Sequence, residues 1–194
     1  MNWFRCIGGG GGESPIVFKN YAKFNGIGII LPWTINADYK IECVFYEKEY
    51  INNTCITGST GSWSNAPYLA AYSNRFDVGI IGSYASFGDW SAGEHTYINN
   101  DENNQSTLDG TASANYNPTT NSYFYTLGCR DGSTTGMGYQ GYIKSFKIYS
   151  KSSGDLLHHL KPCAIAGVPA FCDIADGDTI YLGSGLQVVD SIPT

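Results

Sequence analysis

Acidic side chains are the first candidates for chemistry, because hydrolysis of a glycan needs two carboxylates roughly 5–9.5 Å apart. In sandwich glycosidases the pair commonly belongs to a Glu-x-Asp-x-x-Glu cluster on one strand, and this sequence has no such cluster. Glu47 and Glu49 share a strand face only if the strand continues past Tyr46, and the intervening Lys48 favours a solvated edge. We therefore expect a protein that is not an enzyme.

Histidine chemistry has equally little support in the sequence. There is no Gly-x-Ser-x-Gly nucleophile motif, and His95, His158 and His159 have no partnering motif. His158 and His159 are adjacent on a predicted strand, so their rings should point to opposite faces and not share a metal ion. We expect one of the two rings to be hydrogen-bonded inside the fold and the other to be exposed.

Calcium is the one cofactor that the residue types suggest. Oxygen donors gather within nine positions at Asp101, Glu102, Asn103, Asn104 and Asp109, and Ca²⁺ prefers carboxylate and amide oxygens. Their spacing does not match an EF-hand loop. A calcium site at Asp101, Glu102 and Asp109 and an ordinary polar loop therefore stay open as alternatives, and no other cofactor is expected.

Sugar binding would use an aromatic platform for the apolar face of a pyranose ring, with polar groups bonding its hydroxyls. Loops, or strand ends beside them, carry four candidates for this role: Trp63, Trp90, Tyr97 and Arg130. Because tryptophan is highly buried on average, the alternative is that Trp33, Trp63 and Trp90 belong to a core or an interface.

Composition narrows the class of partner. The chain has 194 residues with 24 glycines, 14% aromatic residues and a net charge of −6, which argues against nucleic acid and anionic membranes. The longest apolar run is far shorter than a membrane span, and no secretory signal is expected at the N-terminus. Six cysteines without a Cys-x-x-Cys pair favour packed, reduced thiols, with a disulfide between Cys163 and Cys172 as the minor alternative.

Residues 1–15 differ from the remainder of the chain. They combine an apolar head with the glycine run at positions 8–12, a composition typical of a flexible linker. Trp3, Phe4 and Ile7 would cost solubility if left in water, so we expect them to dock on another protein. Alternatively, Trp3 and Phe4 fold back as a first edge strand. Residues 16–194 are predicted to form one domain.

The pattern from residue 16 onward indicates short strands and little or no helix. In residues 39–46, alternation places Tyr39, Ile41, Cys43 and Phe45 on one face. Turn signals recur at roughly ten-residue spacing, and no fixed repeat is visible. These features favour an all-β, two-sheet antiparallel sandwich or jelly roll. The predicted strands are 28–31, 39–46, 68–71, 75–81, 95–99, 105–108, 123–129, 142–149 and 179–182.

Residues 138–190 resemble the closing strands of the laminin G-like, concanavalin A-like lectin sandwiches of tailed phages and prophages. The matching features are a glycine at 141, Ile-Lys-Ser-Phe-Lys-Ile-Tyr at 143–149, a turn at 153–155, an apolar strand at 156–160 ending in Pro162-Cys163, Phe171-Cys172-Asp173, and Tyr-Leu-Gly-Ser-Gly at 181–185. Residues 108–110 and 123–130 extend the resemblance upstream. Cys172 stands where a tyrosine is common in these domains.

This resemblance implies a setting rather than a reaction. It points to a phage virion accessory protein: a capsid decoration, head fibre or tail attachment, made in the host cytoplasm and held to capsid or tail proteins by its N-terminal head. The alternative is an adhesin that binds glycans on the host surface. An oligomer is compatible with either function, although the sequence encodes no coiled-coil stalk.

Overall fold

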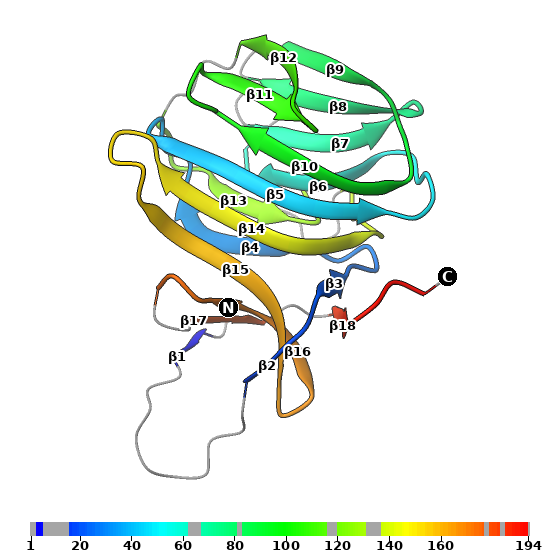
Figure 1. Ribbon diagram of the computed structural model, residues 1–194, viewed down its shortest axis with the longest axis vertical. Helices are drawn as coiled ribbons and strands as arrows, with labels where there is room; N and C mark the ends of the chain where they lie inside the picture. The colour runs from blue at the N-terminus through cyan, green and yellow to red at the C-terminus, as the bar shows by residue number, and fades with distance from the viewer. Residues whose placement is uncertain are drawn as a thin grey trace.

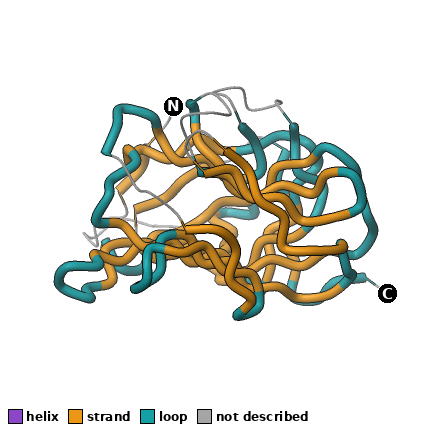
Figure 2. The backbone as a smooth tube through the Cα atoms, turned by 90° about the horizontal axis from the view of Figure 1, so that it is seen from above, coloured by secondary structure: helices purple, strands orange, loops and turns teal. Residues whose placement is uncertain are grey.

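The computed structural model describes residues 3–5, 16–61, 67–80, 83–115, 120–130, 137–176, 179–182 and 185–193. Within these residues the chain forms strands and no helix (Figures 1 and 2). The strands are β1 (Trp3–Arg5), β2 (Ile16–Phe18), β3 (Tyr21–Lys23), β4 (Ile29–Thr34), β5 (Tyr39–Glu47), β6 (Thr54–Ser59), β7 (Tyr68–Tyr72), β8 (Arg75–Ile80), β9 (Ser83–Asp89), β10 (Gly93–Asn99), β11 (Gln105–Leu108), β12 (Thr111–Asn115), β13 (Phe124–Leu127), β14 (Tyr142–Ser150), β15 (Leu156–Ile165), β16 (Val168–Asp173), β17 (Thr179–Leu182) and β18 (Gln187–Val189).

The strands form two antiparallel sheets that pack face to face, which confirms the predicted sandwich (Figure 1). The large sheet runs β1-β17-β16-β15-β14-β5-β10-β11-β12, with β2 on β15, β3 on β14 and β18 on β3. The small sheet runs β4-β13-β6-β7-β8-β9. At the centre of the large sheet, β5 pairs with both β14 and β10, so residues far apart in the sequence are neighbours there.

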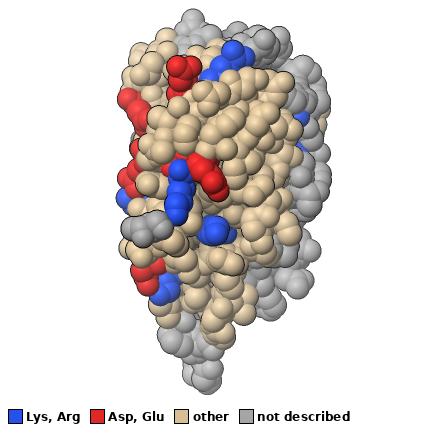
Figure 3. Space-filling model, turned by 90° about the vertical axis from the view of Figure 1, so that its right-hand side faces the viewer, with Lys and Arg blue, Asp and Glu red and all other residues tan. Residues whose placement is uncertain are grey.

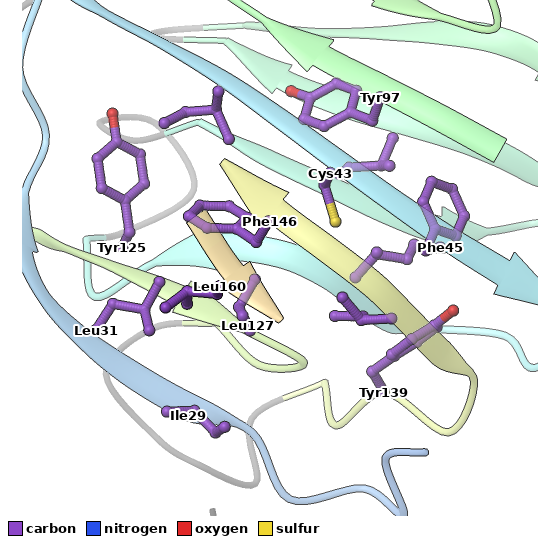
Figure 4. Packing of buried hydrophobic residues seen from close by; sticks show 14 of the residues in the cluster. Ile29, Leu31, Cys43, Phe45, Tyr97, Tyr125, Leu127, Tyr139, Phe146 and Leu160 are labelled. Atoms are coloured by element: carbon purple, nitrogen blue, oxygen red, sulfur yellow. The ribbon is translucent and has the colours of Figure 1, made fainter. Parts of the chain in front are cut away.

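Alternation along the central strands fills the space between the sheets. On β5, Ile41, Cys43 and Phe45 are buried, as the sequence predicted. From β14, Phe146 and Ile148 are buried on the same side. They meet Leu31 and Leu127 from the small sheet (Figure 4). Burying such apolar side chains, at roughly 1.5–3 kcal/mol each, is the main force that holds the two sheets together.

A tight turn forms at Asp109-Gly110, one of the turn signals in the sequence. Asp109 and Gly110 join β11 to β12 with φ angles of 51° and 79°, the left-handed geometry that a two-residue hairpin requires. Asp109 tolerates this geometry partly because its short carboxylate bonds to nearby groups. Its Oδ1 accepts the backbone N–H of Thr96 at 2.8 Å. The turn therefore fixes the register of the β10–β12 edge.

The described cysteines are all fully buried, at positions 43, 55, 129, 163 and 172. This agrees with the prediction of packed thiols. The alternative disulfide between Cys163 and Cys172 is not formed. The two residues lie on neighbouring strands but out of register, because Cys163 faces Ala170 and Cys172 faces Lys161. In the described part of the chain, no helix that could cross a membrane is found.

Candidate functional site

A cavity of about 300 Å³ opens at one end of the sandwich, and we call it the Glu47 cavity. It forms where the end of β5, the start of β14 and the end of β3 converge, on the right-hand side of Figure 1. From that side, basic and acidic side chains lie next to one another on a face that is otherwise mostly uncharged (Figure 3). The cavity is lined by Lys23, Glu47, Lys48, Glu49, Gln140, Gly141, Tyr142 and Pro193.

Glu47 is the most unusual group in this cavity. It is the last residue of β5, its exposed fraction is 4%, and its Oε1 has no hydrogen-bond partner among the described residues. Burial raises the pKa of its carboxyl to about 8, although a hydrogen bond with Tyr139 acts in the opposite direction. At neutral pH the group is therefore mostly protonated, and it can both donate and accept a hydrogen bond.

Gly141 keeps room at the base of the site. A Cβ atom on Gly141 would lie 2.2 Å from the hydroxyl oxygen of Tyr139, so a larger residue would displace the ring. Tyr139 is fully buried, and its hydroxyl donates to the backbone oxygen of Tyr46 at 3.3 Å. Figure 4 shows Tyr139 at the edge of the core, just before β14 begins. The tyrosine thus forms a wall between the core and the Glu47 carboxyl.

Aromatic rings and lysines continue from the cavity along the outer face of the large sheet. Tyr142 makes edge contacts with both Tyr21 and Tyr46, each at 6.4 Å between ring centroids. Lys23 Nζ lies 6.0 Å from the Tyr142 ring and Lys144 Nζ 6.0 Å from the Tyr21 ring, both at the outer limit of cation–π attraction. At the mouth, Lys48 Nζ donates to the backbone oxygen of Pro193 at 2.7 Å, so the C-terminal segment borders the cavity.

The residues that the sequence suggested for sugar binding do not meet at one surface. Trp63 lies outside the described residues. Tyr97 is 1% exposed, and together with Tyr68 it lines an internal space of about 10 Å³ that can hold no sugar. Arg130 is buried as well, with its guanidinium 5.4 Å from the Tyr68 ring. A buried ring offers no platform to a ligand in solvent, so Tyr97 is corrected to a core residue.

Trp90 is the fourth of those candidates, and it is half-buried. It follows β9 and packs against the core, and its ring makes an edge contact with Tyr50 at 5.8 Å. Its backbone N–H donates to the carbonyl of Asn74 at 2.9 Å, which fixes the start of the loop. Trp90 does not line the Glu47 cavity. These contacts agree with the alternative that Trp90 belongs to a core or an interface.

The three acidic residues considered for calcium each have a protein partner. Asp101 Oδ1 accepts the backbone N–H groups of Asn103 and Gln105 and so closes its own loop. Glu102 pairs with Lys40 at 2.6 Å. Asp109 Oδ2 lies 2.7 Å from Nδ1 of His95. Each carboxylate thus bonds to a different part of the protein. This arrangement agrees with the alternative of an ordinary polar loop.

The backbone of the N-terminal head forms the edge strand that the sequence offered as the alternative to docking. Trp3 and Phe4 lie in β1, which pairs with β17 in the register Trp3↔Tyr181 and Phe4↔Ile180. Ile7 lies outside the described residues. Docking of this head on a partner stays a prediction.

The structure brings together one cluster that sequence reasoning missed. Ligand atoms of His158, Asp173 and Asp176 lie within 4.8 Å of one another. His158 also stacks on Trp33 at 3.8 Å. Asp173 is fully buried, and its two oxygens accept hydrogen bonds from the His158 ring and from the backbone N–H groups of His159 and Ala175. With its oxygens engaged in this way, Asp173 serves the fold by joining β15 to the end of β16.

Comparison with known proteins agrees with the fold. No family model and no curated protein matches the chain. Among solved structures, it is similar to a "putative carbohydrate binding protein" from Bacteroides ovatus ATCC 8483, with a TM-score of 0.60 and 13% sequence identity over 90% of this chain. The likeness concerns the fold, a two-sheet antiparallel β-sandwich. The chain spans 61% of the length of that structure.

Proposed function

We propose that the protein is a non-catalytic carbohydrate-binding module and that the Glu47 cavity is its sugar site. The observation that carries the proposal is a buried glutamic acid that lines a cavity of about 300 Å³ and whose Oε1 has no partner in the described part of the chain. Ligand pockets begin at roughly this size, and they fix a ligand with a few polar groups. The similar structure described as carbohydrate binding supports the same class of ligand.

The chemistry of the lining suits sugar hydroxyls, which both donate and accept hydrogen bonds. The protonated Glu47 carboxyl and the Gln140 amide offer both functions, whereas Lys23 and Lys48 only donate. Tyr142 also lines the cavity, but its ring is 4% exposed, so the polar groups carry the recognition. Binding would satisfy Glu47 Oε1, which otherwise carries the cost of a buried, unpaired polar atom, about 1–3 kcal/mol.

The test is a screen on a glycan array followed by calorimetric titration of the best oligosaccharide. Gln140→Ala removes an exposed side chain from the cavity, and we expect at least fivefold weaker binding, since one hydrogen bond contributes about 1 kcal/mol. Gln187→Ala is the matched control, because Gln187 is also exposed but lies on β18 outside the lining. Equal affinities of both variants and the parent would reject the cavity as the site.

The phage setting is a separate proposal, which rests on the resemblance of residues 138–190. We propose a virion accessory protein made in the host cytoplasm, with residues 1–12 as its anchor to capsid or tail proteins. Cosedimentation with phage particles, comparing the full chain with one lacking residues 1–12, tests this placement. Head-dependent cosedimentation would support it. Absence of cosedimentation for the full chain would favour an adhesin or a free lectin instead.

A further inference from the structure

A second hollow on the outer face of the large sheet concentrates positive charge, and we call it the lysine groove. Its volume is about 250 Å³, and it is lined by Lys19, Asn20, Lys144, Ser145, Lys147, His159 and Lys161. It therefore holds four of the 11 lysines and arginines of a chain whose net charge is −6. Such a concentration of one sign on an acidic protein indicates an anionic ligand.

The strand register explains why these side chains share a face. Lys147 of β14 stands directly opposite His159 of β15, and its neighbours Phe146 and Ile148 point into the core. Lys161 lies two residues beyond His159 and therefore projects from the same face. The backbone N–H of Lys19 donates to the carbonyl of Pro162 at 2.9 Å and so holds the segment between β2 and β3 against β15. The groove is thus built from paired backbone rather than from free loops.

Three of the lysines are held at the rim by carboxylates. Lys147 pairs with Glu42 at 2.6 Å, Lys144 with Glu94 at 2.9 Å, and Lys19 with Asp190 at 2.7 Å. The pairs of Lys144 with Glu94 and of Lys19 with Asp190 are exposed and exchange readily, because an exposed ion pair contributes little to stability. The Lys147–Glu42 pair is partly buried.

Lys161 and His159 differ from those three lysines. Lys161 is exposed and forms no ion pair with any described residue. The Nε2 atom of His159 is buried, and no described residue forms a hydrogen bond with it. Burial and the positive charges of Lys147 and Lys161 lower the pKa of His159, so its ring is mainly neutral at neutral pH. Within the residues that the structure describes, the groove therefore contains both an unpaired cation and an unpaired ring nitrogen.

The lysine groove and the Glu47 cavity lie along the same strands. Lys23 and Tyr142 line the cavity, Lys144 lines the groove, and Tyr21 contacts both Tyr142 and Lys144 between them. A chain of sugars that occupies the cavity can therefore continue over Tyr21 toward Lys161.

We propose that the lysine groove binds the carboxylate or sulfate group of an acidic saccharide whose neighbouring sugar occupies the Glu47 cavity. This inference rests on the proposed function, because it names the class of sugar. Lys161 supplies the principal charge-assisted contact, and the ring of His159 supplies a second hydrogen bond. Lys144 and Lys19 exchange part of their exposed pairing with Glu94 and Asp190 for the incoming anion.

The test uses an array on which sulfated, uronate-containing and sialylated oligosaccharides are each printed beside their neutral counterparts, followed by titration of the best pair. We expect the acidic member to bind at least tenfold more tightly at low salt. Lys161→Glu should abolish that preference and leave the affinity for the neutral member unchanged. Lys151→Glu, which reverses a lysine outside the groove, should leave the preference intact. Gln140→Ala should weaken both members.

The remaining outcomes separate the two proposals. Equal binding of acidic and neutral members, unchanged by Lys161→Glu, would overturn the groove while leaving carbohydrate binding in place. Competition by inorganic sulfate at the same concentration as the acidic oligosaccharide would overturn the saccharide assignment, because the groove would then be a general anion site. Absence of binding to every printed glycan, by a protein shown to be folded, would overturn both proposals.

Discussion

Nδ1 of His158 lies 2.7 Å from Oδ2 of Asp173, and the other oxygen of that carboxylate accepts the backbone N–H of His159 at 2.8 Å. The same arrangement occurs a second time, where Asp109 bonds His95 Nδ1 at 2.7 Å and the backbone N–H of Thr96 at 2.8 Å. In each case an aspartate from a later strand end or turn holds a histidine and the residue after it. The two copies differ in burial, since Asp173 is fully buried and the Asp109 side chain is 48% exposed.

This difference predicts unequal costs for the same substitution. Asp173→Asn removes the charge from a carboxylate that accepts three hydrogen bonds, and we expect it to lower the free energy of unfolding by about 2–3 kcal/mol. Asp109→Asn should cost less, about 1 kcal/mol, because water replaces the lost contacts. Urea denaturation of both variants measures the two values. Equal losses would show that burial does not set the strength of this contact.

Acid should weaken the buried copy. Burial by itself would raise the pKa of Asp173, but the hydrogen bonds from His158, His159 and Ala175 lower it below its ordinary value. A carboxylate with a lowered pKa stabilises the fold above its unfolded pKa of about 4, and that contribution disappears as the pH falls through the folded value. The stability gap between the parent and Asp173→Asn should therefore narrow below pH 4. A constant gap down to pH 2 would contradict this assignment.

Glu47 should act in the opposite direction. Its pKa rises from 4.5 to about 8 on folding, so the folded chain binds one more proton than the unfolded chain between these values. The free energy of unfolding should then fall with rising pH, by up to about 1.4 kcal/mol per pH unit. Glu47→Gln replaces the titratable carboxyl with an amide that does not ionise. The free energy of unfolding should then change less between pH 5 and 8. Chemical denaturation at a series of pH values checks this, and parallel profiles would show that Glu47 ionises normally.

Gly138 is predicted to tolerate no side chain. A Cβ atom there would lie 2.0 Å from the backbone oxygen of Gly26, so one of the two segments would have to move. Gly138→Ala should therefore cost more than 2 kcal/mol, as overpacking against backbone does. Gly154→Ala is the control, because nothing lies within 4 Å of its added Cβ and only its φ of 78° is unfavourable, at about 1–2 kcal/mol. Thermal unfolding of both variants would rank them, and the reverse order would contradict the prediction.

The expectation that the protein is not an enzyme can be tested at the same cavity. Glu47 and Glu49 both line it. Glycoside hydrolases use a protonated carboxyl as general acid together with a second carboxylate. We expect no release of reducing ends when the oligosaccharides that bind are incubated with the protein. Release that disappears in Glu47→Gln would instead identify a hydrolase.

The sequence was informative where one face of a strand meets the core. Strict alternation at Ile41, Cys43 and Phe45 predicted both the strand and its inward face, and all three side chains are buried. It failed for β6, because all six residues of Thr54–Ser59 are buried and the period-two signal is lost. The strand β15 was recognised only over its first half, since Pro162 interrupts an otherwise regular run.

The Glu47 cavity could not be predicted from spacing. Its lining comes from residues 23, 47–49, 140–142 and 193, which are brought together only by the pairing of β14 with β5 and β3. The position of Glu47 depends on whether the strand continues past Tyr46, and the sequence analysis left this question open. The strand does continue, to Glu47, and this last residue carries the carboxyl that makes the cavity polar. The solvated edge favoured by Lys48 is therefore correct for Lys48 itself, which is exposed.

The buried cysteines can serve as natural probes of local unfolding. The five described thiols have no exposed surface, and burial raises the pKa of Cys129 to about 12 and that of Cys43 further still. Because only an exposed thiolate reacts with alkylating reagents, modification of these sites must wait for strands to separate. In a Cys6→Ser background, the rate of labelling at each position would map the local free energy of opening across both sheets, with no introduced probe.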